Sequence, residues 1–258
     1  MPYDTTQICY KLTKRDGTTH PPRVWSENTT PPNKRTCMRT RWDHNITHTT
    51  WFHESAVRCT PPLYPQNCTG EGLHAFKTIE DALRGGYGYH LQWGDRLWKA
   101  GASGSITIPC FGDKLCATQM TTIREIRHYE IRRRFPIDML REWAALFWDA
   151  YAKQPGITPQ RRRAIRRRAN VLRDPAQDST HFPRIHTSPD RSKSVQLMFV
   201  HRRSNLRGMN EWELRAHLLK TIKMYQDQFS NILPVLPSKR DAFRSLRCRQ
   251  KTQTQSSS

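Results

Sequence analysis

The 258-residue chain is strongly basic, with 43 lysines and arginines against 22 acidic residues and a net charge of +21. Only 36% of its residues are hydrophobic and the mean hydropathy is −0.82, yet it carries 8 tryptophans. The length is sufficient for a hydrophobic core, and this aromatic content excludes a wholly disordered chain. The excess of positive charge predicts an anionic partner, such as nucleic acid or an acidic protein surface.

The sequence contains no apolar run long enough to cross a membrane, so we expect no membrane partner. Residues Met1 to Thr6 show neither a basic leader nor the apolar stretch of a signal peptide, which predicts a protein that is not secreted on a signal of its own. The 7 cysteines are odd in number and irregularly spaced, as is typical of a reducing compartment rather than of a disulfide framework.

The first part of the chain, residues 1–70, is rich in threonine and proline. Three Pro-Pro pairs divide it into pieces too short for stable helices, which predicts an irregular Thr/Pro-rich N-terminal arm. Its aromatic residues are able to dock on a core, so a loose arm and a docked arm are both open alternatives.

The next segments predict a helix followed by a small antiparallel sheet. Apolar residues between Leu73 and Arg84 follow helical spacing, and Gly85 supplies a left-handed stop. Apolar and polar residues alternate from Tyr87 to Trp93, which indicates a strand, and Gly94-Asp95 can form a hairpin turn. A further alternating stretch, Ile106 to Cys110, completes the expected sheet.

Helical periodicity dominates from Thr121 onward. The pattern predicts a helix over residues 121–135, a strongly apolar core helix over residues 136–151, and a third helix that begins with Thr158 as its N-cap and Pro159 in its first turn. Residues 195–201 are typical of a strand.

The last predicted helix starts at Asn210, with Glu213 three residues later, and should end before Pro234. The basic and polar residues that follow predict a disordered C-terminal tail. The expected fold is therefore α+β, with a small antiparallel sheet packed with several helices in a main domain over residues 71–232 and a basic tail over residues 233–258.

Two runs of three arginines form the strongest electrostatic feature, and no carboxylate lies between them. Guanidinium groups match phosphate groups in a bidentate manner, so the predicted helix near residues 158–173 suits contact with nucleic acid, nuclear import or docking to an acidic protein. A solvated helix face is the alternative. The basic patch consists of Arg161, Arg162, Arg163, Arg166, Arg167 and Arg168.

The sequence predicts neither a metal site nor a catalytic centre. Zinc remains an alternative for the histidines and cysteines of the arm, but their spacing departs from the close pairs of structural zinc sites; these residues are His44, His48, His53, Cys59 and Cys68. Because no motif of an activated nucleophile is present, we expect a non-enzymatic protein without a cofactor.

The segment from Gly88 to Lys99, GYHLQWGDRLWK, together with ITIPC at residues 106–110, resembles the Bet group of foamy retrovirus accessory proteins. The resemblance covers residues 73–148. It implies a viral accessory protein of the infected cell that binds host APOBEC-type cytidine deaminases. Such a protein acts as a restriction factor antagonist by occluding the deaminase and keeping it out of virions.

Two functions therefore compete. Capture of a host protein would use an aromatic surface formed by Tyr87, Tyr89, Trp93 and Trp98. A nucleic-acid-binding viral transcriptional regulator would instead act through the arginine-rich helix, with affinity that falls steeply with salt. Both functions place the protein in the host cytoplasm and nucleus.

Overall fold

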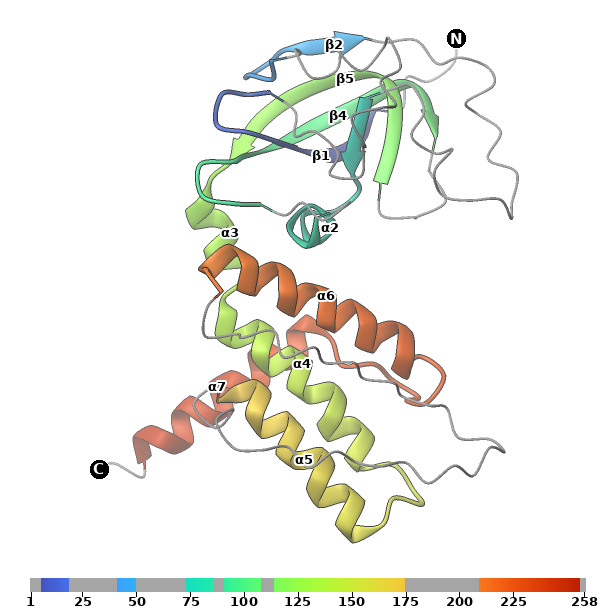
Figure 1. Cartoon of the computed structure of the whole chain (residues 1–258), viewed down its shortest axis with the longest axis vertical. Coiled ribbons are helices and arrows are strands. Elements are labelled where there is room, and N and C mark those ends of the chain that lie inside the picture. Colours follow the sequence, from blue (N-terminus) through green and yellow to red (C-terminus); the bar gives the residue numbers. More distant parts are fainter. Residues whose placement is uncertain are drawn as a thin grey trace, which may run out of the picture. The chain divides into compact units, whose positions relative to one another are not determined.

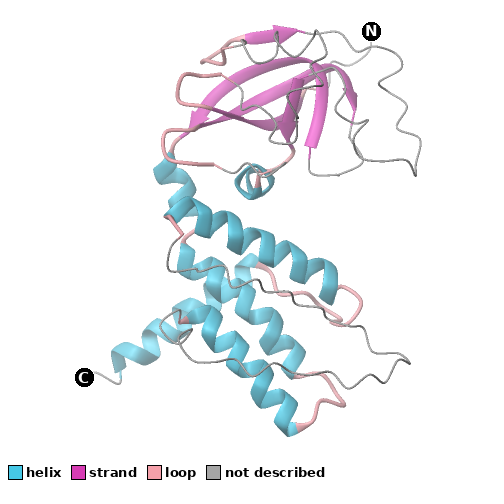
Figure 2. Ribbon diagram, in the orientation of Figure 1, coloured by secondary structure: helices cyan, strands magenta, loops and turns pink. Residues whose placement is uncertain are grey.

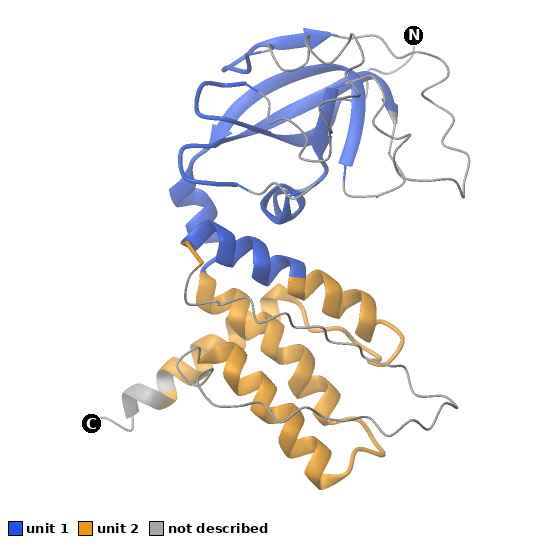
Figure 3. Cartoon of the chain, viewed as in Figure 1, with its two compact units in different colours: residues 1–136, 211–220 blue, residues 137–210, 221–258 orange. Residues whose placement is uncertain are grey.

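The computed structural model describes residues 6–18, 41–49, 73–85, 91–107, 114–174 and 209–255. The chain divides into two compact units (Figure 3): residues 1–136 with 211–220 form unit 1, and residues 137–210 with 221–258 form unit 2. The boundary after Pro136 falls inside the range expected for one main domain. Helix α6 (Glu211–Phe229) contributes its first part to unit 1 and its second part to unit 2.

Unit 1 contains an antiparallel sheet, in agreement with the α+β expectation (Figures 1 and 2). The spatial order is β2-β5-β3-β1-β4, and β4 also pairs with β5. Four of the strands therefore close on themselves, and β2 extends the sheet from β5. The strands are β1 (Gln7–Thr13), β2 (Thr47–Thr49), β3 (Leu73–Phe76), β4 (Arg96–Thr107) and β5 (Lys114–Ile126).

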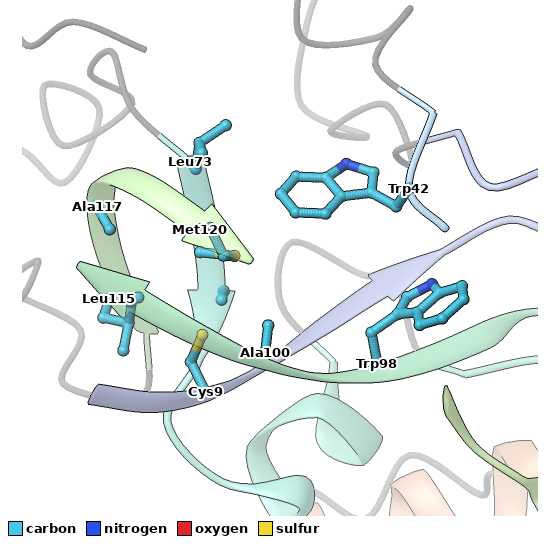
Figure 4. Close-up of a cluster of buried hydrophobic side chains, with 10 residues drawn as sticks. Cys9, Trp42, Leu73, Trp98, Ala100, Leu115, Ala117 and Met120 are labelled. Carbon is cyan, nitrogen blue, oxygen red and sulfur yellow. The ribbon is translucent and has the colours of Figure 1, made fainter. Parts of the chain in front are cut away.

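A cluster of buried side chains fills this closed sheet (Figure 4). Trp42 and Trp98 are its largest members, and small alanines on the neighbouring strands leave space for the two indole rings. Trp98 Nε1 donates to Thr13 Oγ1 over 3.2 Å, which satisfies the buried indole N–H. The cluster consists of Cys9, Trp42, Leu73, Ala75, Trp98, Ala100, Ala102, Leu115, Ala117 and Met120.

The two long strands, β4 and β5, curve by means of two irregularities in their pairing. The register shifts between Lys99 and Ala100 and again between Ser103 and Ile106. Gly104 lies inside the second shift with φ +73°, a left-handed conformation that favours glycine. Bulges of this kind increase twist and bend a strand, which helps the four strands to close on themselves.

The first 70 residues are not entirely irregular, contrary to the expectation for the arm. Strand β1 lies in the middle of the sheet, paired with β3 and β4. Its alternating sequence, QICYKLT, carries the strand signal, which the high Thr and Pro content of the surrounding residues obscured. Most of the remaining arm lies outside the described residues.

Two expected helices are wrong at their starts. Leu73–Phe76 forms β3, and helix α2 (Ile79–Arg84) begins only after the N-cap Thr78. Similarly, residues 121–126 continue β5, and helix α3 (His128–Arg134) follows. In both segments pairing with neighbouring strands outweighs the local helical spacing of apolar residues.

The expected strand over residues 87–93 is wrong at its described end. Leu91 to Trp93 form no strand but lead into a turn before β4. The Asp95 carboxylate accepts the Gln92 N–H over 2.8 Å and stabilises this turn, in which Gly94 has φ +88°. The described hairpin joins β4 to β5, and the first residues of β4 pair with β1 on its other edge. The expected strand over residues 195–201 lies outside the described residues.

Unit 2 is helical in its described part, with α4 (Ile137–Ala152), α5 (Pro159–Arg173), the end of α6 and α7 (Lys239–Gln255). The predicted core helix and the predicted arginine-rich helix are confirmed as α4 and α5. Aromatic rings pack between α4 and α6, with Trp148 and Phe229 at 5.6 Å between ring centroids.

Helix α7 corrects the expectation of a disordered C-terminal tail. Ser238 and Asp241 cap it reciprocally: Ser238 Oγ accepts the Asp241 N–H over 3.3 Å, and the Asp241 carboxylate accepts the Ser238 N–H over 2.9 Å. This Ser-x-x-Asp capping box was present in the sequence and would have indicated a helix start.

Candidate nucleic-acid interface

Helix α5 begins at a conventional N-cap and packs on α4 through a narrow apolar stripe. Thr158 Oγ1 accepts the Arg161 N–H over 3.3 Å, and Pro159 occupies the first turn. Ile165 and Ala169, four residues apart, are buried. Val171 and Leu172 near its end are half-buried, and arginines dominate the remaining surface. The packing therefore fixes which arginines face α4 and which face solvent.

Three of the six predicted arginines are engaged within unit 2. Arg162 Nε donates to the carbonyl of Ala152 over 2.9 Å and so caps the C-terminal end of α4. Arg161 donates to the Tyr151 hydroxyl over 3.2 Å. Arg168 lies over the Trp148 ring at 5.0 Å from the centroid, and burial lowers the pKa of this guanidinium from its usual value. These side chains therefore help to hold α5 on α4.

The other three form an exposed row that we call the arginine stripe: Arg163, Arg166 and Arg167. Residues three and four apart lie on the same face of a helix, so the three guanidinium groups project together. Within the described residues none of them forms a hydrogen bond, an ion pair or a ring contact. Helix α5 carries seven arginines and no acidic residue, so no carboxylate on the helix offsets the mutual repulsion of the stripe.

A buried carboxylate, Glu142, joins α5 and α7 to α4. Its side chain is only 3% exposed. It accepts hydrogen bonds from Arg173 Nε at 2.7 Å, Arg173 Nη2 at 2.9 Å and Ser245 Oγ at 2.7 Å. Arg249 Nε lies 3.6 Å away. Because Arg173 ends α5 and Ser245 lies on α7, one residue fixes both basic helices.

The charges in this pairing are mutually stabilised. Burial by itself would raise the pKa of Glu142, but hydrogen bonds from Arg173 and Ser245 outweigh it and keep the pKa below its usual value. Burial likewise opposes the charged form of Arg173, whereas its bonds to Glu142 and Asp149 raise its pKa overall. The α5 backbone is therefore anchored by an ionised pair at neutral pH.

Helix α7 presents a second basic row that sequence reasoning assigned to a disordered tail. Arg240, Arg244 and Arg247 are exposed and follow one another at intervals of four and three residues, which places them on one helix face. The four- and three-residue spacing of these arginines in the sequence is typical of one face of a helix. Recognising it required the helix start at Ser238 to be identified first.

The four predicted aromatic contact residues do not form one surface. Trp98 is 1% exposed and belongs to the core of unit 1, so its expected role in partner binding is wrong: its indole ring faces the sheet interior. Trp93 is 58% exposed. Tyr87 and Tyr89 lie outside the described residues.

The histidines and cysteines considered for zinc are only partly described. The His48 ring packs against Trp42, with centroids 4.2 Å apart, while His44 is exposed. Cys116 Sγ lies 3.0 Å from His74 Nδ1 on the neighbouring strand. No group of three or more metal-ligating side chains occurs in the part of the chain that the structure describes. His53, Cys59 and Cys68 lie outside it.

The helices over the described ranges are each too short or too polar to cross a membrane. Comparison of the chain with protein-family models, with curated proteins and with solved structures gave no match.

Proposed function

We propose that this chain is a non-enzymatic nucleic-acid-binding protein that contacts the phosphate backbone through the arginine stripe. The observation that carries the proposal is the division of the α5 arginines. Three of them contact residues of α4, while Arg163, Arg166 and Arg167 are exposed and have no ion-pair or hydrogen-bond partner among the described residues. A row of guanidinium forks on a rigid helix matches a row of phosphates.

The rigidity of α5 supports this proposal. The helix is held at its first turn by Arg162, near its middle by Ile165 and Arg168, and at its end by Arg173. The three exposed side chains therefore start from a fixed backbone, which lowers the entropy lost when they bind. The row on α7 adds positive charge to the same unit and strengthens attraction over a longer range.

The experiment is an anisotropy titration of a labelled oligonucleotide with the full chain at several salt concentrations. Neutralising three phosphate-binding charges removes about 2–3 from the slope of log affinity against log salt. We therefore expect the triple variant R163Q/R166Q/R167Q to bind more weakly and with a shallower slope than the wild type.

A charge-matched control separates the stripe from the overall positive charge. Lys14, Lys77 and Lys153 lie outside the α5 face, and K14Q/K77Q/K153Q removes the same net charge. We expect this variant to keep most of the wild-type slope. Equal loss in both triple variants would refute the stripe as the binding site, and no binding by the wild type at low salt would refute the function.

Capture of a host cytidine deaminase, which the Bet resemblance implies, remains a prediction. Of the aromatic residues expected to bind the deaminase, Trp98 is buried in the core, and Trp93 is exposed among the described residues. Copurification of a deaminase with the full chain after nuclease treatment would support it, and copurification only before nuclease treatment would support the nucleic-acid function instead.

A further inference from the structure

An exposed tryptophan in unit 1 suggests what kind of nucleic acid binds. Trp93 is 58% exposed, although buried Trp212 lies edge-on to it at 5.6 Å between ring centroids and His128 lies at 5.5 Å. The Arg132 guanidinium lies over the Trp93 ring at 4.7 Å from the centroid. We call these four residues the Trp93 platform. The open surface of the Trp93 ring and the buried position of Trp212 against it distinguish the platform from a loosely held surface side chain.

Hydrogen bonds hold the Arg132 and His128 side chains of the Trp93 platform in place. Glu211 accepts from Arg132 Nε at 2.9 Å and from Arg132 Nη2 at 2.8 Å. His128 Nε2 donates to the Asp95 carbonyl over 2.8 Å, which ties α3 to the turn that carries Trp93. The ring is therefore held in place before any ligand binds, and little conformational entropy is lost on stacking against it.

Exposed basic and aromatic residues occur on the segments that carry the Trp93 platform. The side chain of Arg15 lies beside Gly94, the next residue after Trp93. Arg15 and Arg133 are exposed, and neither forms an ion pair or a hydrogen bond within the described ranges. Tyr129, on α3, is 60% exposed. The nearby carboxylates are already engaged, since Glu211 pairs with Arg132.

An exposed indole ring and an uncompensated guanidinium group beside the turn that carries it match the two parts of an unpaired nucleotide. Aromatic rings stack on the faces of bases, and arginines attract the phosphates between them. In a duplex the base faces are covered by neighbouring bases, so a ring such as Trp93 gains nothing from stacking unless the strand is open.

Resting on the proposed function, we infer that Trp93 is a stacking site for an unpaired nucleobase and that the chain prefers single-stranded nucleic acid. The arginine stripe contacts phosphates in either form of nucleic acid. The platform supplies the discrimination between them.

The test compares a labelled single strand of mixed sequence with the blunt duplex of the same length, both titrated with the full chain. We expect the wild type to bind the single strand more tightly. Trp93→Ala should lower single-strand affinity about thirtyfold, the middle of the range for one base–aromatic contact, and leave duplex affinity unchanged within about twofold. Trp93→Phe should retain most of the single-strand affinity, because it keeps an aromatic face.

Ile8→Ala is the matched control, because Ile8 is an exposed apolar residue of unit 1, at 42% exposure, on another element. Both variants are compared with the wild type by thermal unfolding to establish that they are folded. The inference is overturned if Trp93→Ala weakens both ligands equally or neither. It is also overturned if this variant abolishes capture of a purified cytidine deaminase while single-strand affinity is unchanged.

The experiments distinguish failure of the proposed function from failure of the stacking site. A wild type that binds neither ligand at low salt contradicts the proposed function. If R163Q/R166Q/R167Q weakens both ligands but Trp93→Ala has no effect on either, the proposed function stands and the stacking site is rejected.

Discussion

The two carboxylates that bind Arg173 should differ sharply in their contribution to stability. Both are in direct contact with the same Nη2 atom, Glu142 at 2.9 Å and Asp149 at 2.5 Å. The Glu142 side chain is 3% exposed and that of Asp149 is 28% exposed. Burial, rather than distance, should therefore determine the cost of removing each one.

Glu142→Ala leaves the Arg173 guanidinium, 11% exposed, without its main partner in a buried environment. Removing one member of a buried pair typically costs about 3–5 kcal/mol. Asp149→Ala leaves the Glu142 bonds in place and removes a partner that water can replace, so its cost should be about 1 kcal/mol or less.

The assay is urea unfolding of the full chain, followed by the circular dichroism of the helices. Ser245→Ala provides the control for the third hydrogen bond to Glu142 and should cost about 1 kcal/mol. Equal destabilisation by Glu142→Ala and Asp149→Ala would refute the reasoning, as would a loss of less than about 1 kcal/mol for Glu142→Ala.

Three further outcomes are expected. Because the pKa of Glu142 is lowered in the folded state from 4.5, its contribution to stability should be complete above about pH 4.5 and be lost as the pH falls through the depressed value; acid titration of helical content should show this loss in the wild type and not in Glu142→Ala. Arg162→Gln should destabilise the chain by about 1 kcal/mol through loss of the α4 cap, whereas Arg163→Gln should change thermal stability by less than about 0.5 kcal/mol; similar values would contradict the division of the arginines. Gly104→Ala should lower the unfolding midpoint, since φ is +73° and a new Cβ would collide with the Thr118 hydroxyl; an unchanged midpoint would show that the bulge is not constrained.

The helices of unit 2 were the most predictable part of the fold, because their signals are local. Thr158-Pro159 marks the start of α5, and the long apolar periodicity of α4 stops before Pro155. Helix α7 was missed although Ser238 and Asp241 form a capping box. Its exposed, arginine-rich sequence resembles a polar tail in composition alone, and only the cap distinguishes the two.

The sheet was less predictable, because its pairing partners are distant in sequence. Strand β1 pairs with β4, about 90 residues later, and Trp98 is buried through contacts such as that with Thr13. No local pattern distinguishes the buried Trp98 from the exposed Trp93, five residues earlier. Alternation locates a strand but does not show which face will be covered.

The candidate site, like the fold, could be predicted from local sequence only in part. The sequence identified all six arginines as one basic patch, and their charge is indeed uncompensated by acidic residues on α5. Which ones are free depends on where α4 lies, since Arg162 reaches the Ala152 carbonyl and Arg168 the Trp148 ring. A helical wheel shows which residues share a face, but only the position of the neighbouring helix α4 shows which face is exposed to solvent.

We propose above all that the three exposed guanidinium groups of the arginine stripe on α5 bind phosphates. The most direct test of this claim is the salt dependence of oligonucleotide affinity for the wild type and R163Q/R166Q/R167Q, measured side by side. We expect the slope of log affinity against log salt to become shallower by about 2–3 in the variant, in proportion to the charges removed. Identical slopes for the two proteins would contradict the claim.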